Sequence, residues 1–177
     1  MRFCFAFLSL CFLFSCNQEK MPDHVVLADK ITGKYTEQIK KDENFSLVGF
    51  GSNYVNGIHR IGLDFQSERT VNITEARNLL VRSVSKLLDA VNSNEDIRRY
   101  LDHYPYTAKG IELAIDFSDK NEHECKNGSI AYVYVFHNKR ANENVVLYKV
   151  YDLEKRNYVE VHRETYEEAE RIVRTGG

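Results

Sequence analysis

Few residues of this chain stand in a pattern that could do chemistry. His123 and Cys125, flanked by two glutamates, are of types that bind metals, but the spacing His-x-Cys matches no common zinc motif and no second ligand pair lies nearby. A polar loop between two strands explains them equally well. The six histidines are accompanied by no nucleophile motif such as G-x-S-x-G. The sequence therefore indicates no metal, no cofactor and no catalytic residue.

Gly49-Phe50-Gly51 is a glycine-rich segment of a kind that can cradle a phosphate. Phosphate-binding loops need a strand, then the glycines, then a helix, whereas a second strand is expected after this segment. We interpret the glycines as part of a strand. The face that they leave without side chains could still accept a molecule packed flat against it.

Tyrosine-rich segments are the best candidates for a binding surface. Tyr104 and Tyr106 flank a proline, and Tyr132 and Tyr134 alternate along a segment that is expected to be a strand. A tyrosine ring is apolar while its hydroxyl is polar, which suits recognition of a glycan or a protein. Ordinary packing of a helix-to-strand connection, and of a sheet half covered by helices, would explain the same residues. We keep these four tyrosines as a possible binding surface.

The charge balance excludes one class of partner. The chain has 24 lysine and arginine residues against 26 aspartate and glutamate residues, a formal net charge of -2. Binding to nucleic acid usually needs a basic surface, so we expect no nucleic-acid partner. The 177 residues, of which 28% are charged, suit one globular domain that is long enough to bury a core.

The first sixteen residues have the features of a bacterial export signal. Arg2 supplies positive charge, and the apolar run from Phe3 to Phe14 is too short to span about 30 Å of hydrocarbon as a helix. The run ends in Leu13-Phe14-Ser15-Cys16, which resembles the lipobox of bacterial lipoproteins in its leucine, its small residue and its cysteine. The resemblance implies that residues 1–15 are a signal peptide and that Cys16 becomes the acylated first residue of the mature protein. The alternatives are an ordinary cleaved signal with a chance cysteine and an apolar terminus that is not cleaved.

The anchor would set the location of the protein. Acyl chains on Cys16 imply lipid attachment to a membrane of the bacterial cell envelope. By resemblance to the sorting rule of bacteria with two membranes, Asn17 favours the outer membrane. Residues 16–21 then form a short tether, of which Asn17 to Met21 spans at most roughly 18 Å. The mature chain keeps only Cys16 and Cys125, so no intramolecular disulfide is expected.

The segment 47–66 is predicted to be a β-hairpin. Asn56-Gly57 is typical of a two-residue loop, since a type I′ turn needs a positive φ at both positions. With this loop Tyr54 lies opposite His59. One face, predicted to be buried, carries Val48, Phe50, Tyr54, Ile61, Leu63 and Phe65, with Phe50 opposite Leu63 and Val48 opposite Phe65. The other face carries Gly49, Gly51, Asn53, Arg60, Gly62 and Asp64.

Periodicity and capping residues predict the remaining elements. Helices are expected over 22–41, from Asn72 with Glu75 completing a capping box, briefly over 94–103, and from Thr165. Alternating residues predict strands near 111–117, 130–136, 145–151 and 158–162. The order αββα(α)ββββα predicts an α+β fold with an antiparallel sheet of about five or six strands and helices largely on one face. Residues 22–177 are expected to form this single domain.

The function is inferred from the anchor and from the missing catalytic pattern, because no family resemblance extends into the folded part. The leading hypothesis is a membrane-anchored, non-catalytic binding or assembly module whose partner is an envelope protein or a glycan. The alternatives are an envelope enzyme acting on cell-wall polymer and a purely structural envelope protein. A perturbed carboxylate or histidine in a deep cleft would favour the enzyme. An exposed apolar or tyrosine-rich patch would favour the binding module.

Overall fold

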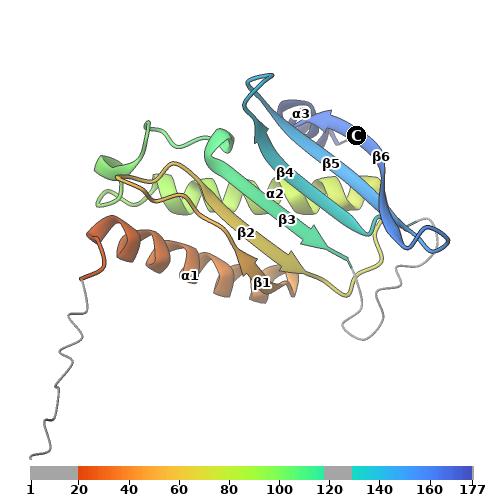
Figure 1. The fold of residues 1–177 in the computed structure, drawn as a ribbon, viewed down its shortest axis with the longest axis horizontal. Helices are drawn as coiled ribbons and strands as arrows, with labels where there is room; N and C mark the ends of the chain where they lie inside the picture. The colour runs from red at the N-terminus through yellow and green to blue at the C-terminus, as the bar shows by residue number, and fades with distance from the viewer. Residues whose placement is uncertain (1–19, 118–128, 177) are drawn as a thin grey trace, which may run out of the picture.

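The computed structural model describes residues 20–117 and 129–176, in which three α-helices accompany a six-stranded sheet (Figure 1). The helices are α1 (Asp23–Glu43), α2 (Ile73–Asn92) and α3 (Tyr166–Thr175), with short 3-10 helices at Arg98–Tyr100 and Ala108–Gly110. The strands are β1 (Ser46–Phe50), β2 (Ile61–Gln66), β3 (Ile111–Asp116), β4 (Tyr132–Asn138), β5 (Glu143–Asp152) and β6 (Asn157–Thr165). None of the described helices is long and apolar enough to cross a membrane.

The strands lie in the sheet in the order in which they follow one another in the sequence. All neighbouring pairs are antiparallel except β2 and β3, which run parallel with Ile61 opposite Ile111. These two strands are joined through α2, because parallel neighbours need a crossover connection in place of a hairpin turn. The α+β class is confirmed, and the expectation of an antiparallel sheet is wrong at this one pair.

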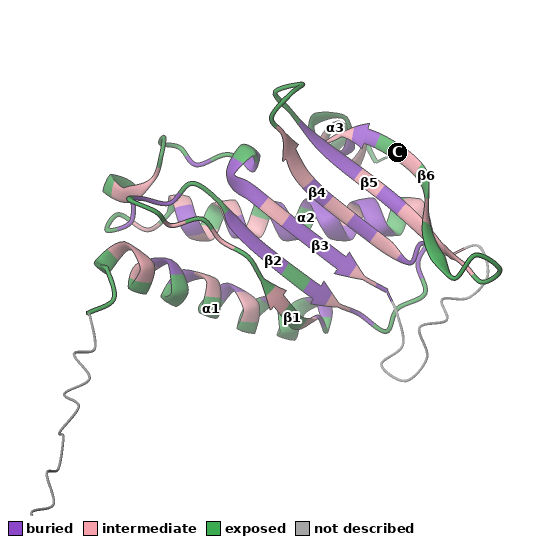
Figure 2. Ribbon diagram, in the orientation of Figure 1, coloured by how far each residue is buried: buried purple, intermediate pink, exposed green. Residues whose placement is uncertain are grey.

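The central strands bury one face of the sheet beneath α2 and α3, whereas no described helix covers the other face (Figures 1 and 2). Apolar side chains alternate on the covered face and are buried: Leu63, Phe65, Leu113, Ile115, Val133 and Val135. Helix α1 packs against α2 at the β1 side of the sheet. There the Tyr35 hydroxyl donates a hydrogen bond to the Ser83 carbonyl at 2.9 Å, and the Tyr35 ring meets the Phe65 ring edge-on.

Capping residues begin α2 and α3 as the sequence predicts. The Glu75 amide donates to the Asn72 side chain at 3.0 Å, and the Asn72 amide donates back to the Glu75 carboxylate at 2.9 Å. Thr165 and Glu168 form the same reciprocal pair at the start of α3. Each pair satisfies amides for which the first turn of a helix has no partner.

The short helix predicted over 94–103 is only a 3-10 helix at Arg98–Tyr100. The Asn94 side chain accepts a hydrogen bond from the Ile97 amide at 3.2 Å, as at a helix N-cap, but only a turn and the 3-10 helix follow. The Tyr100 carbonyl then accepts a bond from the Ile58 amide at 2.7 Å, outside its own segment. A tertiary contact therefore replaces the continued helix.

The β1–β2 hairpin forms, but the prediction for its buried face is wrong on β1. Phe50 lies opposite Leu63 as predicted, whereas a β-bulge at Val48 places Leu47 opposite Phe65. Phe50 is 77% exposed and Val48 is 59% exposed. The physical reason is that β1 is an edge strand, and α1 presents only small or polar side chains beside it.

The hairpin loop is also wider than two residues. Asn53 pairs with Arg60 in the predicted register, but the ladder stops there, since the Ile58 amide donates to the Tyr100 carbonyl and not to Val55. Asn56 and Gly57 do adopt positive φ angles, of 58° and 154°. The structure shows no bridge between Tyr54 and His59, because the Ile58 amide, which would extend the ladder to Val55, donates to the neighbouring segment.

A buried ion pair joins α2 to β6 under the covered face. The Arg77 guanidinium donates to both oxygens of the Glu164 carboxylate, at 2.7 and 3.1 Å, and the Tyr148 hydroxyl donates to the same carboxylate. Arg77 and Glu164 are only 8% and 9% exposed. The hydrogen bond with Glu164 raises the pKa of Arg77, and burial raises the pKa of the Tyr148 hydroxyl. The Arg77 guanidinium and the Tyr148 hydroxyl therefore both stay protonated beside the Glu164 carboxylate.

Candidate functional site

The uncovered face of the sheet holds a hollow of about 330 Å³. Its lining consists of two glycines, two carboxylates and two tyrosines: Gly51, Gly62, Asp64, Glu112, Tyr132 and Tyr134. The register of β2, β3 and β4 brings them together, because Gly62 lies opposite Glu112 and Asp64 lies opposite Ala114, which in turn lies opposite Tyr134. Side chains alternate across a strand, so these residues all point away from the helices. We call this site the carboxylate–tyrosine hollow.

Two glycines form the floor of the hollow between β1 and β2. The Gly51 amide donates to the Gly62 carbonyl at 3.1 Å. A β-carbon on Gly62 would overlap the Gly51 carbonyl, so the two backbones can approach this closely only because residue 62 is glycine. The floor is the glycine-rich face that the sequence offers to a molecule packed flat against it.

Carboxylates give the hollow an excess of negative charge. Asp64 is exposed and makes no hydrogen bond or ion pair with another described residue. Glu112 is paired with Arg60 at 3.1 Å. Beside the hollow, one Asp116 oxygen accepts a long bond from Tyr158 at 3.4 Å, and the other is buried with no partner in the described part of the chain. An ionised carboxylate can only accept hydrogen bonds, so this face suits a ligand that donates them.

A row of aromatic rings borders the carboxylates. The ring centroids of Tyr158 and Tyr132 are 5.9 Å apart, those of Tyr132 and Tyr134 are 6.2 Å apart, and Tyr134 stacks on Phe136 at 5.2 Å. Burial, reinforced by nearby carboxylates, raises the pKa of Tyr132 and that of Tyr134 to about 12 each. Both hydroxyls therefore stay protonated at neutral pH and act as hydrogen-bonding groups beside apolar ring surface.

The structure divides the four tyrosines that the sequence proposes as one surface. Tyr132 and Tyr134 lie together in the hollow. Tyr104 is exposed elsewhere, where the Arg98 guanidinium lies 4.8 Å from its ring. Tyr106 is 2% exposed, and its hydroxyl donates to the Gly110 carbonyl at 2.8 Å, so its assignment to a surface is wrong. Its ring fills the core where the chain turns into β3.

The remaining predicted chemistry lies largely outside the described residues. Cys16, His123 and Cys125 fall in segments that the structure does not describe. Within the described ranges, no group of three or more histidine, cysteine, aspartate or glutamate side chains could hold a metal ion.

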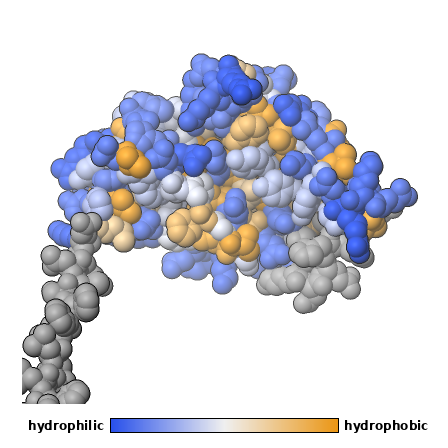
Figure 3. Space-filling view, in the orientation of Figure 1, coloured by the Kyte–Doolittle hydropathy of each residue, from blue (hydrophilic) through white to orange (hydrophobic). Residues whose placement is uncertain are grey.

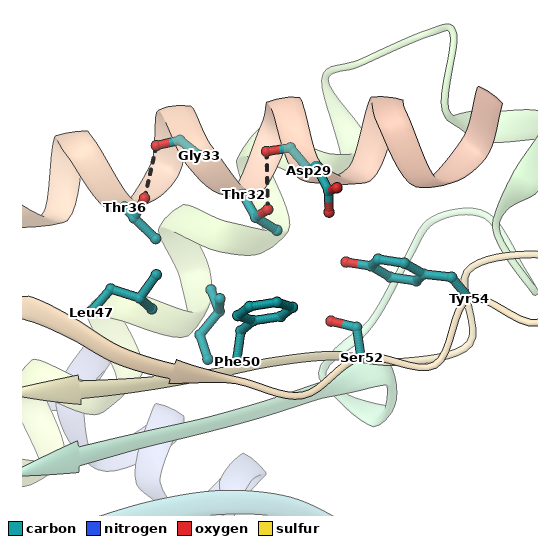
Figure 4. A pocket seen from close by; sticks show the side chains of 9 residues that line it. Asp29, Thr32, Gly33, Thr36, Leu47, Phe50, Ser52 and Tyr54 are labelled. Atoms are coloured by element: carbon teal, nitrogen blue, oxygen red, sulfur yellow. Dashed lines mark hydrogen bonds between the residues drawn. The ribbon is translucent and has the colours of Figure 1, made fainter. Parts of the chain in front are cut away.

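A second hollow, about 220 Å³ in volume, lies between α1 and the edge strand β1 (Figure 4). Leu47, Phe50 and Leu63 form its apolar side, and Thr32 and Thr36 face them from α1. Both threonine hydroxyls donate hydrogen bonds to backbone carbonyls of α1, that of Thr32 at 3.0 Å and that of Thr36 at 2.8 Å, and so are not free to bind a ligand. Hydrophobic side chains show at this edge of the sheet in Figure 3. The groove is smaller than a usual small-molecule pocket, which begins at about 300 Å³, and we assign it no ligand.

A third hollow gathers histidines and lysines beside the hairpin loop: His59, His103, Lys109, His137 and Lys139. His59 Nδ1 lies 2.6 Å from the Asp102 carboxylate, and His59 Nε2 donates to the Val55 carbonyl at 2.8 Å. The bond with Asp102, followed by the bond with Val55, raises the pKa of His59. A ring that donates through both nitrogens cannot accept a proton from a substrate, which argues against a general-base role for His59.

Sequence reasoning missed the carboxylates of the carboxylate–tyrosine hollow as site residues. Glu112 and Asp116 were visible only as the polar half of an alternating strand, and Asp64 only as a residue of the glycine-rich face. Comparison with known proteins adds no relative from which roles could be carried over: no protein-family model, no curated protein and no solved structure matches the chain.

Proposed function

We propose that this chain is a lipid-anchored, non-catalytic binding module of the bacterial cell envelope, and that it holds a neutral or amine-bearing glycan in the carboxylate–tyrosine hollow. The observation that carries the proposal is the hollow itself, in which the exposed Asp64 keeps unpartnered acceptors beside Tyr132 and Tyr134, with the Asp116 carboxylate next to it. The anchor is supported by the lipobox resemblance at Cys16. Asn17 favours the outer membrane in a two-membrane envelope.

The chemistry of the hollow favours a sugar over other ligands. A sugar ring presents hydroxyl donors at its edge and carbon-bound hydrogens on its faces, and the hollow offers carboxylate acceptors beside tyrosine rings. Amino groups on the sugar would gain further from the negative charge. Anionic glycans would place like charges next to Asp64 and Asp116, which is costly. The ligand class is therefore a glycan without carboxylate or sulfate groups.

Calorimetric titration with defined oligosaccharides tests the proposal. We expect N-acetylglucosamine oligomers and glucosamine oligomers to bind, and galacturonate oligomers not to bind. Asp64→Asn should weaken binding by about 1.5–3 kcal/mol, the range for a hydrogen bond to a charged group. Glu154→Gln removes an exposed carboxylate from the β5–β6 turn, away from the hollow, and serves as the matched control. Both variants should unfold at the same denaturant concentration as the parent protein.

Each outcome separates the competing functions. Equal loss of affinity in Asp64→Asn and Glu154→Gln would show that the hollow is not the site. If an oligomer is shortened during incubation, the protein is an envelope enzyme and the proposal of a non-catalytic binding module is wrong. If none of the three oligosaccharide types binds, the glycan proposal is wrong and a purely structural role is favoured.

A further inference from the structure

At the end of the molecule where α1 begins, hydrophobic side chains show among hydrophilic ones (Figures 1 and 3). We call this end the tether-end surface, made up of Met21, Val26, Val55, Arg98, Arg99 and Tyr104. Its four apolar members are each at least half exposed. Large apolar side chains that gather on one surface mark a place of contact with another molecule or a membrane.

Hydrogen bonds and ring contacts hold the three segments of this surface together. His24, in the first turn of α1, donates through Nε2 to the Tyr54 carbonyl at 2.7 Å, and its ring lies 5.6 Å from that of Tyr100. The Ile58 amide donates to the Tyr100 carbonyl at 2.7 Å. The start of α1, the hairpin loop and the segment after α2 thus form one continuous end of the fold.

The arginines of this surface lie against aromatic rings. The Arg98 guanidinium lies 4.8 Å from the centre of the Tyr104 ring, and that of Arg99 lies 4.7 Å from the centre of the Tyr100 ring. Glu95 approaches Arg98 to only 3.9 Å, and no carboxylate in the described part of the chain forms an ion pair with Arg99. Asp23 and Asp96 belong to the same segments. The affinity of this end for another molecule or a membrane therefore depends on the arginines held against aromatic rings and on the apolar residues, not on net charge.

This combination matches the chemistry of a phospholipid surface. Arginine binds phosphate with paired hydrogen bonds. Tyrosine is enriched at the boundary between water and hydrocarbon, and aliphatic side chains insert just below it. A protein partner would need its own complementary patch, for which the described residues give no indication. The proposed anchor at Cys16, which precedes α1, by contrast points to the bilayer.

We infer that the tether-end surface docks on the phospholipid bilayer, with Val55 and Tyr104 inserted among the headgroups and Arg98 and Arg99 on lipid phosphates. The inference rests on the lipid anchor of the proposed function. Only the six residues from Asn17 to Pro22 separate Cys16 from the start of α1 at Asp23. A tether this short keeps the tether-end surface at the membrane and turns the far end, with the β5–β6 turn, into the surrounding compartment (Figure 1).

The absence of tryptophan from the chain makes a direct test possible. The lipidated full-length mature protein is reconstituted into vesicles of phosphatidylethanolamine and phosphatidylglycerol that contain a brominated lipid, which quenches tryptophan at the bilayer surface. Val55→Trp should lose most of its emission. Leu153→Trp, at another exposed apolar position, in the β5–β6 turn, should keep its emission and serves as the control.

Charge removal provides the second measurement. Arg98→Gln with Arg99→Gln, in the Val55→Trp protein, should lower the ratio of docked to undocked protein roughly fivefold for each arginine removed. Lys155→Gln with Arg156→Gln removes a neighbouring basic pair from the far turn and should leave the emission unchanged.

Flotation of the vesicles measures whether the lipid anchor holds the protein on the membrane, independently of whether the tether-end surface docks. Protein that floats while both tryptophans keep their emission would overturn the docking and leave the anchor intact. Stronger quenching of Leu153→Trp than of Val55→Trp would show that the opposite end contacts the membrane, which also overturns the inference. Protein that carries no lipid and does not float would remove the anchor, and the docking inference with it.

Discussion

Replacing Arg77 with alanine is expected to lower the free energy of unfolding by about 3–5 kcal/mol, the usual cost of leaving one partner of a buried ion pair uncompensated. The Glu164 carboxylate would remain under the covering helices with only the Tyr148 hydroxyl and the His162 ring, 3.5 Å away, near it. Chemical unfolding followed by far-ultraviolet circular dichroism measures the loss.

Two further variants show whether the loss arises from the buried charge. Arg77→Leu combined with Glu164→Leu removes both charges, and we expect it to recover much of the stability, since apolar replacement of a whole buried pair is often neutral. Arg163→Ala breaks an exposed pair with Glu160 on the same strand and should hardly move the unfolding midpoint. If Arg77→Ala behaves like Arg163→Ala, the pair is not buried as described.

Phe65→Ala is expected to be the second large loss, at about 3–5 kcal/mol, because the substitution opens a cavity in the core. The Phe65 ring is fully buried between the rings of Tyr35 and Phe45, whose centroids are each 6.1 Å away. Phe50→Ala on the paired strand removes the same number of atoms from a side chain that is 77% exposed. The free energy of unfolding should then change by no more than about 0.5 kcal/mol.

The two phenylalanines form a matched pair for the same unfolding measurement. A large loss in Phe50→Ala with a small one in Phe65→Ala would reverse the assignment of buried and exposed residues across the hairpin. Comparable large losses would mean that α1 closes over Phe50 in solution.

The sequence predicted most reliably those elements whose causes are local. The capping pairs at Asn72 and Thr165 and the alternating strands each depend on neighbouring residues, and the structure contains them. The Asn56-Gly57 signal located the hairpin but could not set the loop's width. That width depends on the Tyr100 carbonyl, which competes for the Ile58 amide from outside the hairpin.

Burial on β1 could not be read from alternation, because alternation tells which side chains share a face and not what covers that face. Phe50 does share a face with Leu63, yet only Leu63 is covered. For the same reason, the carboxylate–tyrosine hollow could not be predicted from alternation within single strands. Asp64, Glu112 and Tyr134 come from three different strands, and they meet only because β3 pairs with both β2 and β4.

The parallel ladder between β2 and β3 also has a kinetic consequence. Residue 61 meets residue 111 only after the chain has closed a loop that contains the whole of α2. Loop closure costs entropy before its contacts can compensate, and non-local pairing slows folding. We therefore expect β1–β2 and β4–β6, each built from sequence neighbours, to gain amide protection early in refolding. The hydrogen bonds between β2 and β3 should form last. In pulsed hydrogen exchange, the amides of these two strands that face each other should be the latest to become protected.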